Sequence, residues 1–167
     1  MNKPGYSFQH FEKKRREHFF HDFQEVYNDA WDGFENFTPL KMETIRESFR
    51  QMEPVADEKL IWFAYFGEEP IAFVLCLPDA NQILKHVNGK LDLPGKLKFL
   101  WYRYTKRVDR IRIIIMGSKK KFQNHGIESA LIRCLQKEVL PRNTIRDVEL
   151  AWVGDFNPKM IALHKAT

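Results

Sequence analysis

The chain has 167 residues and a net charge of +5; 44% of the residues are hydrophobic, 29% are charged, and 8 are Gly and 8 Pro. These values are typical of one globular domain, 1–167, and exclude collagen-like, low-complexity and mostly disordered chains. No apolar run approaches the length of a membrane span, the N-terminus has no signal-peptide core, and Cys76 and Cys134 lie in apolar patterns, so the sequence predicts a cytoplasmic protein with reduced thiols.

The first half of the chain predicts two helices and a hairpin. Residues 1–7 fit a loose or short extended start, and an apolar stripe at spacings of three and four predicts a helix from Phe8 to Trp31. A second helix is expected from Thr38-Pro39, with Thr38 as its cap, to Met52. Two aromatic-rich runs, Lys59–Phe66 and Ile71–Leu77, predict a hairpin.

The second half of the chain alternates helices with strands. We expect a helix at 80–87, a basic aromatic helix at 96–106, a strand at 110–116, a helix at 127–139, a strand at 147–153 and a last helix at 157–166. This order predicts an α/β, or α+β layered, domain with helices on both sides of a central sheet.

Positive charge is concentrated in one third of the sequence. Residues 85–121 contain 12 Lys and Arg against 2 acidic residues, whereas the rest of the chain has 15 basic and 20 acidic residues. Such a stretch favours a polyanion such as nucleic acid, an anionic membrane or a phosphorylated cofactor, and it equally fits a solvated face.

The loop between strand 110–116 and helix 127–139 has the features of an anion site. A helix start presents unpaired N–H groups, Gly126 would let a phosphate come close to the backbone, and Lys119–Lys121 add positive charge. An ordinary strand-to-helix turn fits the same residues. A dinucleotide fingerprint and a P-loop are both excluded, because the required glycines and the Gly-Lys-Ser/Thr sequence are not present here.

The run Gln123-Asn124-His125-Gly126-Ile127-Glu128 resembles the acyl-CoA pyrophosphate loop of the GNAT-type N-acetyltransferase superfamily, Gln/Arg-x-x-Gly-x-Gly/Ala. Gln123 and Gly126 match, and Glu128 replaces the usual small residue. Further segments resemble an uncharacterised bacterial subfamily of GNAT-like proteins, in which two helices join strands three and four: 27–31, 37–39, 77–91 and 149–160. The resemblance covers residues 20–167.

The resemblance implies a GNAT-like mixed central sheet, splayed between its fourth and fifth strands, that binds acetyl-CoA. The pantetheine arm would pair with the backbone of Ile115, Met116 and Gly117. The N–H groups of Gln123, Asn124, His125, Gly126, Ile127 and Glu128 would hold the pyrophosphate. Asn157 matches the family's asparagine near the pantetheine arm, and Lys121, within the run Lys119–Lys121, would meet the ribose phosphate.

The resemblance also implies direct transfer of an acetyl group to a small-molecule or protein amine, without a covalent enzyme intermediate. His164 occupies the place of a tyrosine that often serves as general acid, although an exposed histidine near a chain end fits as well. Glu149 is a candidate base working through water, although an outward-facing strand carboxylate fits it equally. The histidines form no convincing metal set, so no metal is predicted.

The superfamily usually continues with two more strands after its fourth helix, and this sequence ends before them. We expect a truncated gene, a tail beyond this sequence, or another chain that supplies the edge. An uncapped strand at Asp147–Val153 would invite pairing, so the sequence predicts a homodimer through this edge.

Alternative functions remain open. The lack of the last strands and of the tyrosine fits a catalytically degenerate acyl-CoA-binding module. The basic aromatic segment 96–121 fits a nucleic-acid-binding protein, but the helical spacing of Leu97, Leu100, Trp101 and Tyr104 favours aromatics that face the core. Binding to an anionic membrane ranks last, because the segment lacks a sufficiently apolar exposed face.

Overall fold

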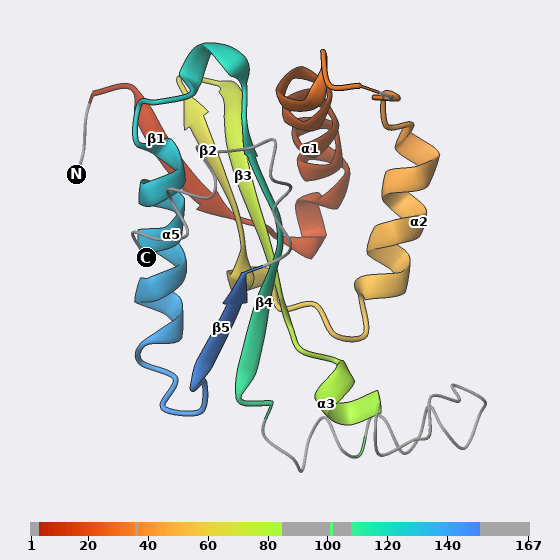
Figure 1. Ribbon diagram of the computed structural model, residues 1–167, viewed down its shortest axis with the longest axis vertical. Coiled ribbons are helices and arrows are strands. Elements are labelled where there is room, and N and C mark those ends of the chain that lie inside the picture. The colour runs from red at the N-terminus through yellow and green to blue at the C-terminus, as the bar shows by residue number, and fades with distance from the viewer. Residues whose placement is uncertain (1–3, 36, 85–100, 102–107, 151–167) are drawn as a thin grey trace.

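The computed structural model describes residues 4–35, 37–84, 101 and 108–150 (Figure 1). Its strands are β1 (Tyr6–His10), β2 (Ile61–Phe66), β3 (Glu69–Pro78), β4 (Arg110–Ser118) and β5 (Asp147–Leu150). Its helices are α1 (Arg16–Trp31), α2 (Met42–Met52), α3 (Asn81–Leu84) and α5 (Ile127–Val139), with short 3-10 turns η1 (Lys13–Arg15), η2 (Glu58–Leu60) and η3 (Lys120–Phe122).

The strands form one mixed sheet whose order, β1-β2-β3-β4-β5, is the order of the chain. β1 to β4 pair antiparallel, and β5 pairs parallel with β4. The predicted hairpin is confirmed, with β3 starting two residues earlier than expected. The predicted strand at 110–116 is also confirmed and extends to Ser118.

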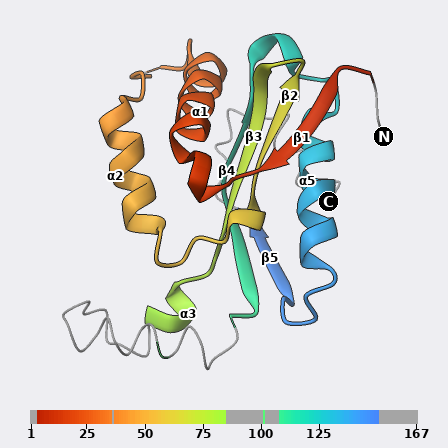
Figure 2. The same cartoon turned by 180° about the vertical axis from the view of Figure 1, so that it is seen from behind.

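Helices cover both faces of the sheet, as the sequence predicted. In Figures 1 and 2, α1 and α2 lie on one side of the sheet and α5 on the other. One core cluster joins the phenylalanines of α1 and α2 to the facing side of β2 and β3, and the second joins α5 to the opposite side. The largest fully buried side chains of the first cluster are Phe19, Phe63 and Phe73.

The start of the chain differs from the expected helix over 8–31. Residues 6–10 form β1, which pairs with β2 from Tyr6↔Phe66 to His10↔Trp62, and α1 begins only at Arg16. Tyr6 and Phe8, two residues apart, both pack against the cluster on the α5 side. The expected extended start at 1–7 agrees with β1 as far as Ser7, whereas residues 8–10, expected in the helix, continue the strand with its two-residue period.

The second helix begins later than the expected Thr38-Pro39 start. α2 begins at Met42, and no side chain caps it. Two side chains of α1 bind the backbone of Leu40 instead: Asn28 Oδ1 accepts from Leu40 N at 2.9 Å, and Gln24 Nε2 donates to Leu40 O at 2.8 Å. These tertiary hydrogen bonds hold Leu40 outside the helix.

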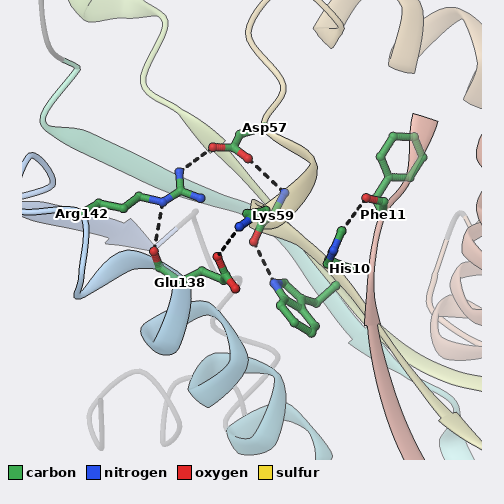
Figure 3. A network of polar contacts seen from close by, with 7 residues as sticks. His10, Phe11, Asp57, Lys59, Glu138 and Arg142 are labelled. Atoms are coloured by element: carbon green, nitrogen blue, oxygen red, sulfur yellow. Dashed lines mark hydrogen bonds and ion pairs between the residues drawn. The ribbon is translucent and has the colours of Figure 1, made fainter. Parts of the chain in front are cut away.

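Polar contacts tie the end of α5 to the start of β2 (Figure 3). Arg142 donates from Nη1 to Asp57 Oδ2 and from Nε to the carbonyl of Glu138, the latter at 3.0 Å. The indole of Trp62 donates to the carbonyl of Lys59 at 2.8 Å. This network joins the helix on one face to the segment that enters the central sheet.

Several predicted elements lie wholly or partly outside the described residues: the helix at 96–106 apart from residue 101, the helix at 157–166, residues 85–87 of the helix at 80–87, and residues 151–153 of the last strand. Within the described residues, the helix predicted at 127–139 is confirmed with those bounds. No helix in the described part is both long and apolar enough to cross a membrane.

Candidate functional site

The junction between β4 and α5 is built around two left-handed backbone positions. After Ser118 the chain makes the short turn η3, and then Asn124 and Gly126 adopt φ values of 67° and 77°. Gly126 is the N-cap residue of α5, and no side chain caps the helix. The first N–H groups of α5 therefore lack intrahelical acceptors and are available to an anion.

The loop residues proposed for the pyrophosphate lie together at this helix start. Gln123 is half-buried and donates from Nε2 to the carbonyl of Ser118 at 3.5 Å, and His125 Nδ1 lies 3.0 Å from the carbonyl of Gln123. Asn124, His125 and Gly126 are exposed, whereas Ile127 is buried in the core. A methyl group on Gly126 would meet no atom within 4 Å, so the backbone there stays open to a ligand.

The strand proposed for the pantetheine arm is only partly paired on its β5 side. β5 pairs with β4 from Arg110 to Ile113, and no described residue continues this pairing along Ile114–Ser118. The β3–β4 register shifts beside Ile114, which bulges β4 and bends it at that point. Among the described residues, the backbone of Ile115–Ser118 therefore has no partner on this side; residues 151–153, which follow β5, lie outside the described part.

The three proposed backbone contacts lie just beyond this bulge. Ile115 packs against the core cluster on the α1 side, and Met116 is buried in the cluster on the α5 side. Gly117 lies beneath the indole of Trp31: a Cβ built there would be 2.4 Å from Trp31 Cζ3. Sequence reasoning did not single out Trp31 for this contact, since it showed only that Trp31 continues an apolar helical stripe.

Each lysine that follows β4 is engaged by a carboxylate. Lys119 is buried and bonds Glu25 and also Glu69, the latter at 2.8 Å. Lys121 bonds Glu69 at 2.9 Å. Lys120 bonds Asp32 at 2.8 Å through its side chain, and its backbone N–H donates to Asp29 at 2.7 Å. The contact of Lys121 with a ribose phosphate stays a prediction. Lys121 would have to make that contact while it is paired with Glu69.

Glu128, the residue that departs from the family pattern, turns back toward the strand. Its carboxylate accepts a hydrogen bond from the Ser118 hydroxyl. This contact bridges the end of β4 and the first turn of α5. It also places a negative charge beside the helix start, which opposes binding of an anion there.

Of the two candidate catalytic residues, Glu149 lies within the described residues and His164 does not. Glu149 on β5 accepts a hydrogen bond from Arg112 Nη2 of β4 at 2.8 Å, next to a second cross-strand ion pair between Arg110 and Asp147. Its role as a base stays a prediction, and a base at this position would have to act while bound to a guanidinium. His164 and Asn157 lie outside the described residues.

Cys76 is buried and Cys134 half-buried, and both are free thiols. Burial raises the pKa of Cys76 to about 12.

Within the described ranges, no three His, Cys, Asp or Glu side chains are grouped as a metal site. The dimer through β5 stays a prediction, which light scattering over a concentration series tests.

Two curated proteins are similar to this chain in sequence. Over 99 residues it is 37% identical to the bacterial ceramide synthase of Caulobacter vibrioides (strain NA1000 / CB15N), a match that covers 59% of this chain and 26% of that protein. Over 143 residues it is 26% identical to Protein YghO of Escherichia coli (strain K12), covering 82% of this chain and 36% of that protein. The chain thus spans about a quarter to a third of the length of these relatives. No protein-family model matches the sequence.

Solved acetyltransferase structures share the fold. An aminoglycoside acetyltransferase, meta-AAC0020, from an uncultured soil sample, in complex with sisomicin, matches with a TM-score of 0.62 and 8% identity over 98% of this chain and 87% of that one. Aminoglycoside N-acetyltransferase AAC(6')-Iy in complex with CoA matches with a TM-score of 0.58 and 13% identity over 96% and 85%. The chain has the GNAT acetyltransferase fold, as the resemblance implied.

Proposed function

We propose that this chain binds acetyl-CoA and transfers the acetyl group to an amine, by direct attack in a ternary complex. The observation that carries the proposal is the uncapped start of α5, with left-handed Gly126, which follows the strand whose backbone at Ile115–Gly117 would align the ligand. The acetyltransferase fold, which CoA-bound AAC(6')-Iy shares, supports it.

Each part of the site has a distinct role in this proposal. The N–H groups from Gln123 to Glu128 bind the pyrophosphate, because a helix start offers donors and a favourable dipole without needing a charged side chain. The backbone of Ile115–Gly117 aligns the pantetheine arm as an added strand would be aligned. The bound thioester supplies the activated acyl carbon, and the chain contributes orientation and the exclusion of water.

The acceptor is proposed to be a small-molecule or protein amine. A longer acyl group and a lipid amine form the second candidate, which is favoured by the similarity to a protein named bacterial ceramide synthase, since a ceramide is an amide of a fatty acid with a long-chain amine. The two free thiols agree with a reducing compartment, so we place the reaction in the cytoplasm.

Two alternative functions predict different outcomes. A degenerate acyl-CoA-binding module would bind CoA and release none of it as free thiol. A nucleic-acid-binding protein would use the basic segment 96–121, but Arg110, Arg112 and Lys119–Lys121 each bond a carboxylate within the described structure. Those ion pairs leave less positive charge for phosphates than the sequence suggested.

The first experiment is calorimetric titration of CoA, acetyl-CoA and a long-chain acyl-CoA into the purified chain, with ATP and NAD as controls. We expect micromolar binding of the CoA species alone, followed by release of free CoA thiol when amines are supplied. If no CoA species binds, the proposed function is wrong, and the loop is only a structural turn.

A pair of glycine variants tests the location of the site. Gly126→Ala places a side chain at a left-handed position in the loop, and Gly67→Ala does the same in the β2–β3 turn, where φ is 61° and no atom lies near the new methyl either. Both variants are expected to lose about 1 kcal/mol of stability. Only Gly126→Ala should weaken CoA binding, and equal binding by both variants would place the ligand elsewhere.

A further inference from the structure

Lys119 is the first residue after β4, and it is fixed there by both its backbone and its side chain. Its N–H donates to the carbonyl of Ile71 at 2.8 Å, which continues the β3–β4 pairing by one residue. Its side chain is only 6% exposed, although it carries a charge. A lysine buried to this extent is unusual unless it is paired.

The partners of Lys119 come from two other elements of the fold. Glu25 lies on α1, and Glu69 is the first residue of β3. The Nζ group bonds both carboxylates, so it joins a helix of one layer to two strands of the sheet at the point where the loop leaves the sheet. Lys121 adds a second bond to Glu69 at 2.9 Å.

The charges around this point argue against direct attraction of phosphate by Lys119. Burial alone would lower the pKa of Lys119, but the hydrogen bonds that it donates to Glu25 and Glu69 outweigh the effect of burial and raise the pKa. The lysines in turn hold the pKa of Glu69 below its usual value. Two acidic side chains thus lie beside a loop that is proposed to bind a polyanion, a position in which charge repulsion alone would disfavour them.

We propose that Lys119 is a positioning residue for coenzyme A binding: clamped by Glu25 and Glu69, it sets the direction in which loop 119–126 leaves β4 and so places the N–H groups at the start of α5. This inference rests on the proposed function. It assigns two acidic residues a supporting role in the binding of an anion.

The two explanations, positioning of the loop and charge repulsion, predict opposite changes in CoA affinity when an acidic side chain is neutralised. Glu25→Gln and Glu69→Gln each remove a negative charge near the loop, which by charge alone would tighten CoA binding. Positioning predicts the opposite, a dissociation constant about tenfold larger, since small displacements of binding groups are costly. Glu68→Gln is the matched control, because Glu68 is exposed, adjoins Glu69 and forms no ion pair with any described residue.

Each variant is first checked for folding by urea unfolding and then titrated with CoA by calorimetry. Glu25→Gln is the conservative choice for folding, because the Glu25 side chain is 55% exposed and Lys119 keeps Glu69. Amide hydrogen exchange at Ala130 and Leu131, the first N–H groups of α5 that have intrahelical acceptors, gives a second readout when measured without ligand. It should become faster in the Glu25 and Glu69 variants and stay unchanged in the Glu68 variant.

The outcomes separate this inference from the proposed function. If the wild-type chain binds no CoA species, the proposed function fails, and the inference fails with it. If the wild type binds but the Glu25 and Glu69 variants bind equally well or more tightly, only the inference is overturned. Weaker binding by both variants, with faster exchange at the helix start and an unaffected Glu68 control, supports it.

Discussion

Replacing Gly117 by alanine tests the packing of α1 against the strand proposed to carry the ligand. In a strand, alanine is ordinarily preferred to glycine by about 0.5–1 kcal/mol. Here the new Cβ would lie 2.4 Å from Trp31 Cζ3 and 2.6 Å from Cη2, distances that real Cβ atoms essentially never show. The indole cannot move freely, because it stacks on Tyr27 at 4.6 Å between ring centroids and lies over Phe73.

The size of the effect follows from how far the ring must move. Reaching ordinary carbon–carbon contact requires a displacement of about 1 Å, and overpacking of this kind costs about 1–3 kcal/mol. After the alanine preference is subtracted, the net loss of unfolding free energy is about 1–2 kcal/mol, which lowers the melting temperature of a domain of this size by about 2–8 °C.

Urea unfolding of wild type, Gly117→Ala, Trp31→Phe and the double variant measures this loss. The phenyl ring is smaller than the indole and leaves room for the methyl group, so the double variant should be more stable than the sum of the single effects by about 1 kcal/mol. Additive effects, or an alanine variant as stable as wild type, would refute the steric argument.

Two further predictions concern buried titratable groups. Cys76, with its pKa raised by burial to about 12, should react with a disulfide reagent only on unfolding, while half-buried Cys134 reacts earlier; equal rates in the native protein, followed by mass spectrometry, would contradict this. Asp22 is buried beside Tyr65, whose hydroxyl donates to it at 2.6 Å, and burial raises the Asp22 pKa. The folded state therefore holds a proton that the unfolded state releases at lower pH, so stability falls as pH rises from about 4 through the raised pKa. Asp22→Asn, which keeps an oxygen for Tyr65, should gain stability relative to wild type over that window; a relative loss in urea unfolding from pH 4 to 8 would mean that the bonds to Asp22 outweigh its burial.

The elements that sequence could predict are those whose pattern is local and long. The stripe from Ile127 to Val139 defined α5 with its observed bounds, and the apolar runs defined β2 and β3. Residues 8–10 of β1 were assigned to the first helix because a strand of five residues is too short to separate a period of two from one of 3.6. The start of α2 was misplaced because Asn28 and Gln24, more than ten residues away, bind Leu40.

The candidate site was predictable only in its backbone. Gly126 and the helix start could be found because the glycine, the preceding strand and the following stripe adjoin in sequence. The partners of the lysines could not: Glu25 and Glu69 lie 94 and 50 positions from Lys119, and no spacing rule links them. The lysine run was therefore interpreted as free positive charge, and the pairing of Glu149 with Arg112 on the neighbouring strand was equally hidden.

The order of strands has a consequence for how the chain is assembled. Because spatial order follows chain order among the described strands, none of them has to insert between two others. The first 78 residues already hold β1 to β3 and both helices of one layer, so this half can pack while the rest is still being synthesised. β4, α5 and β5 then join a finished template. Of the described strands, β4 and β5 are thus added after the other three, and a local opening between them leaves the pairing of β1 to β3 intact.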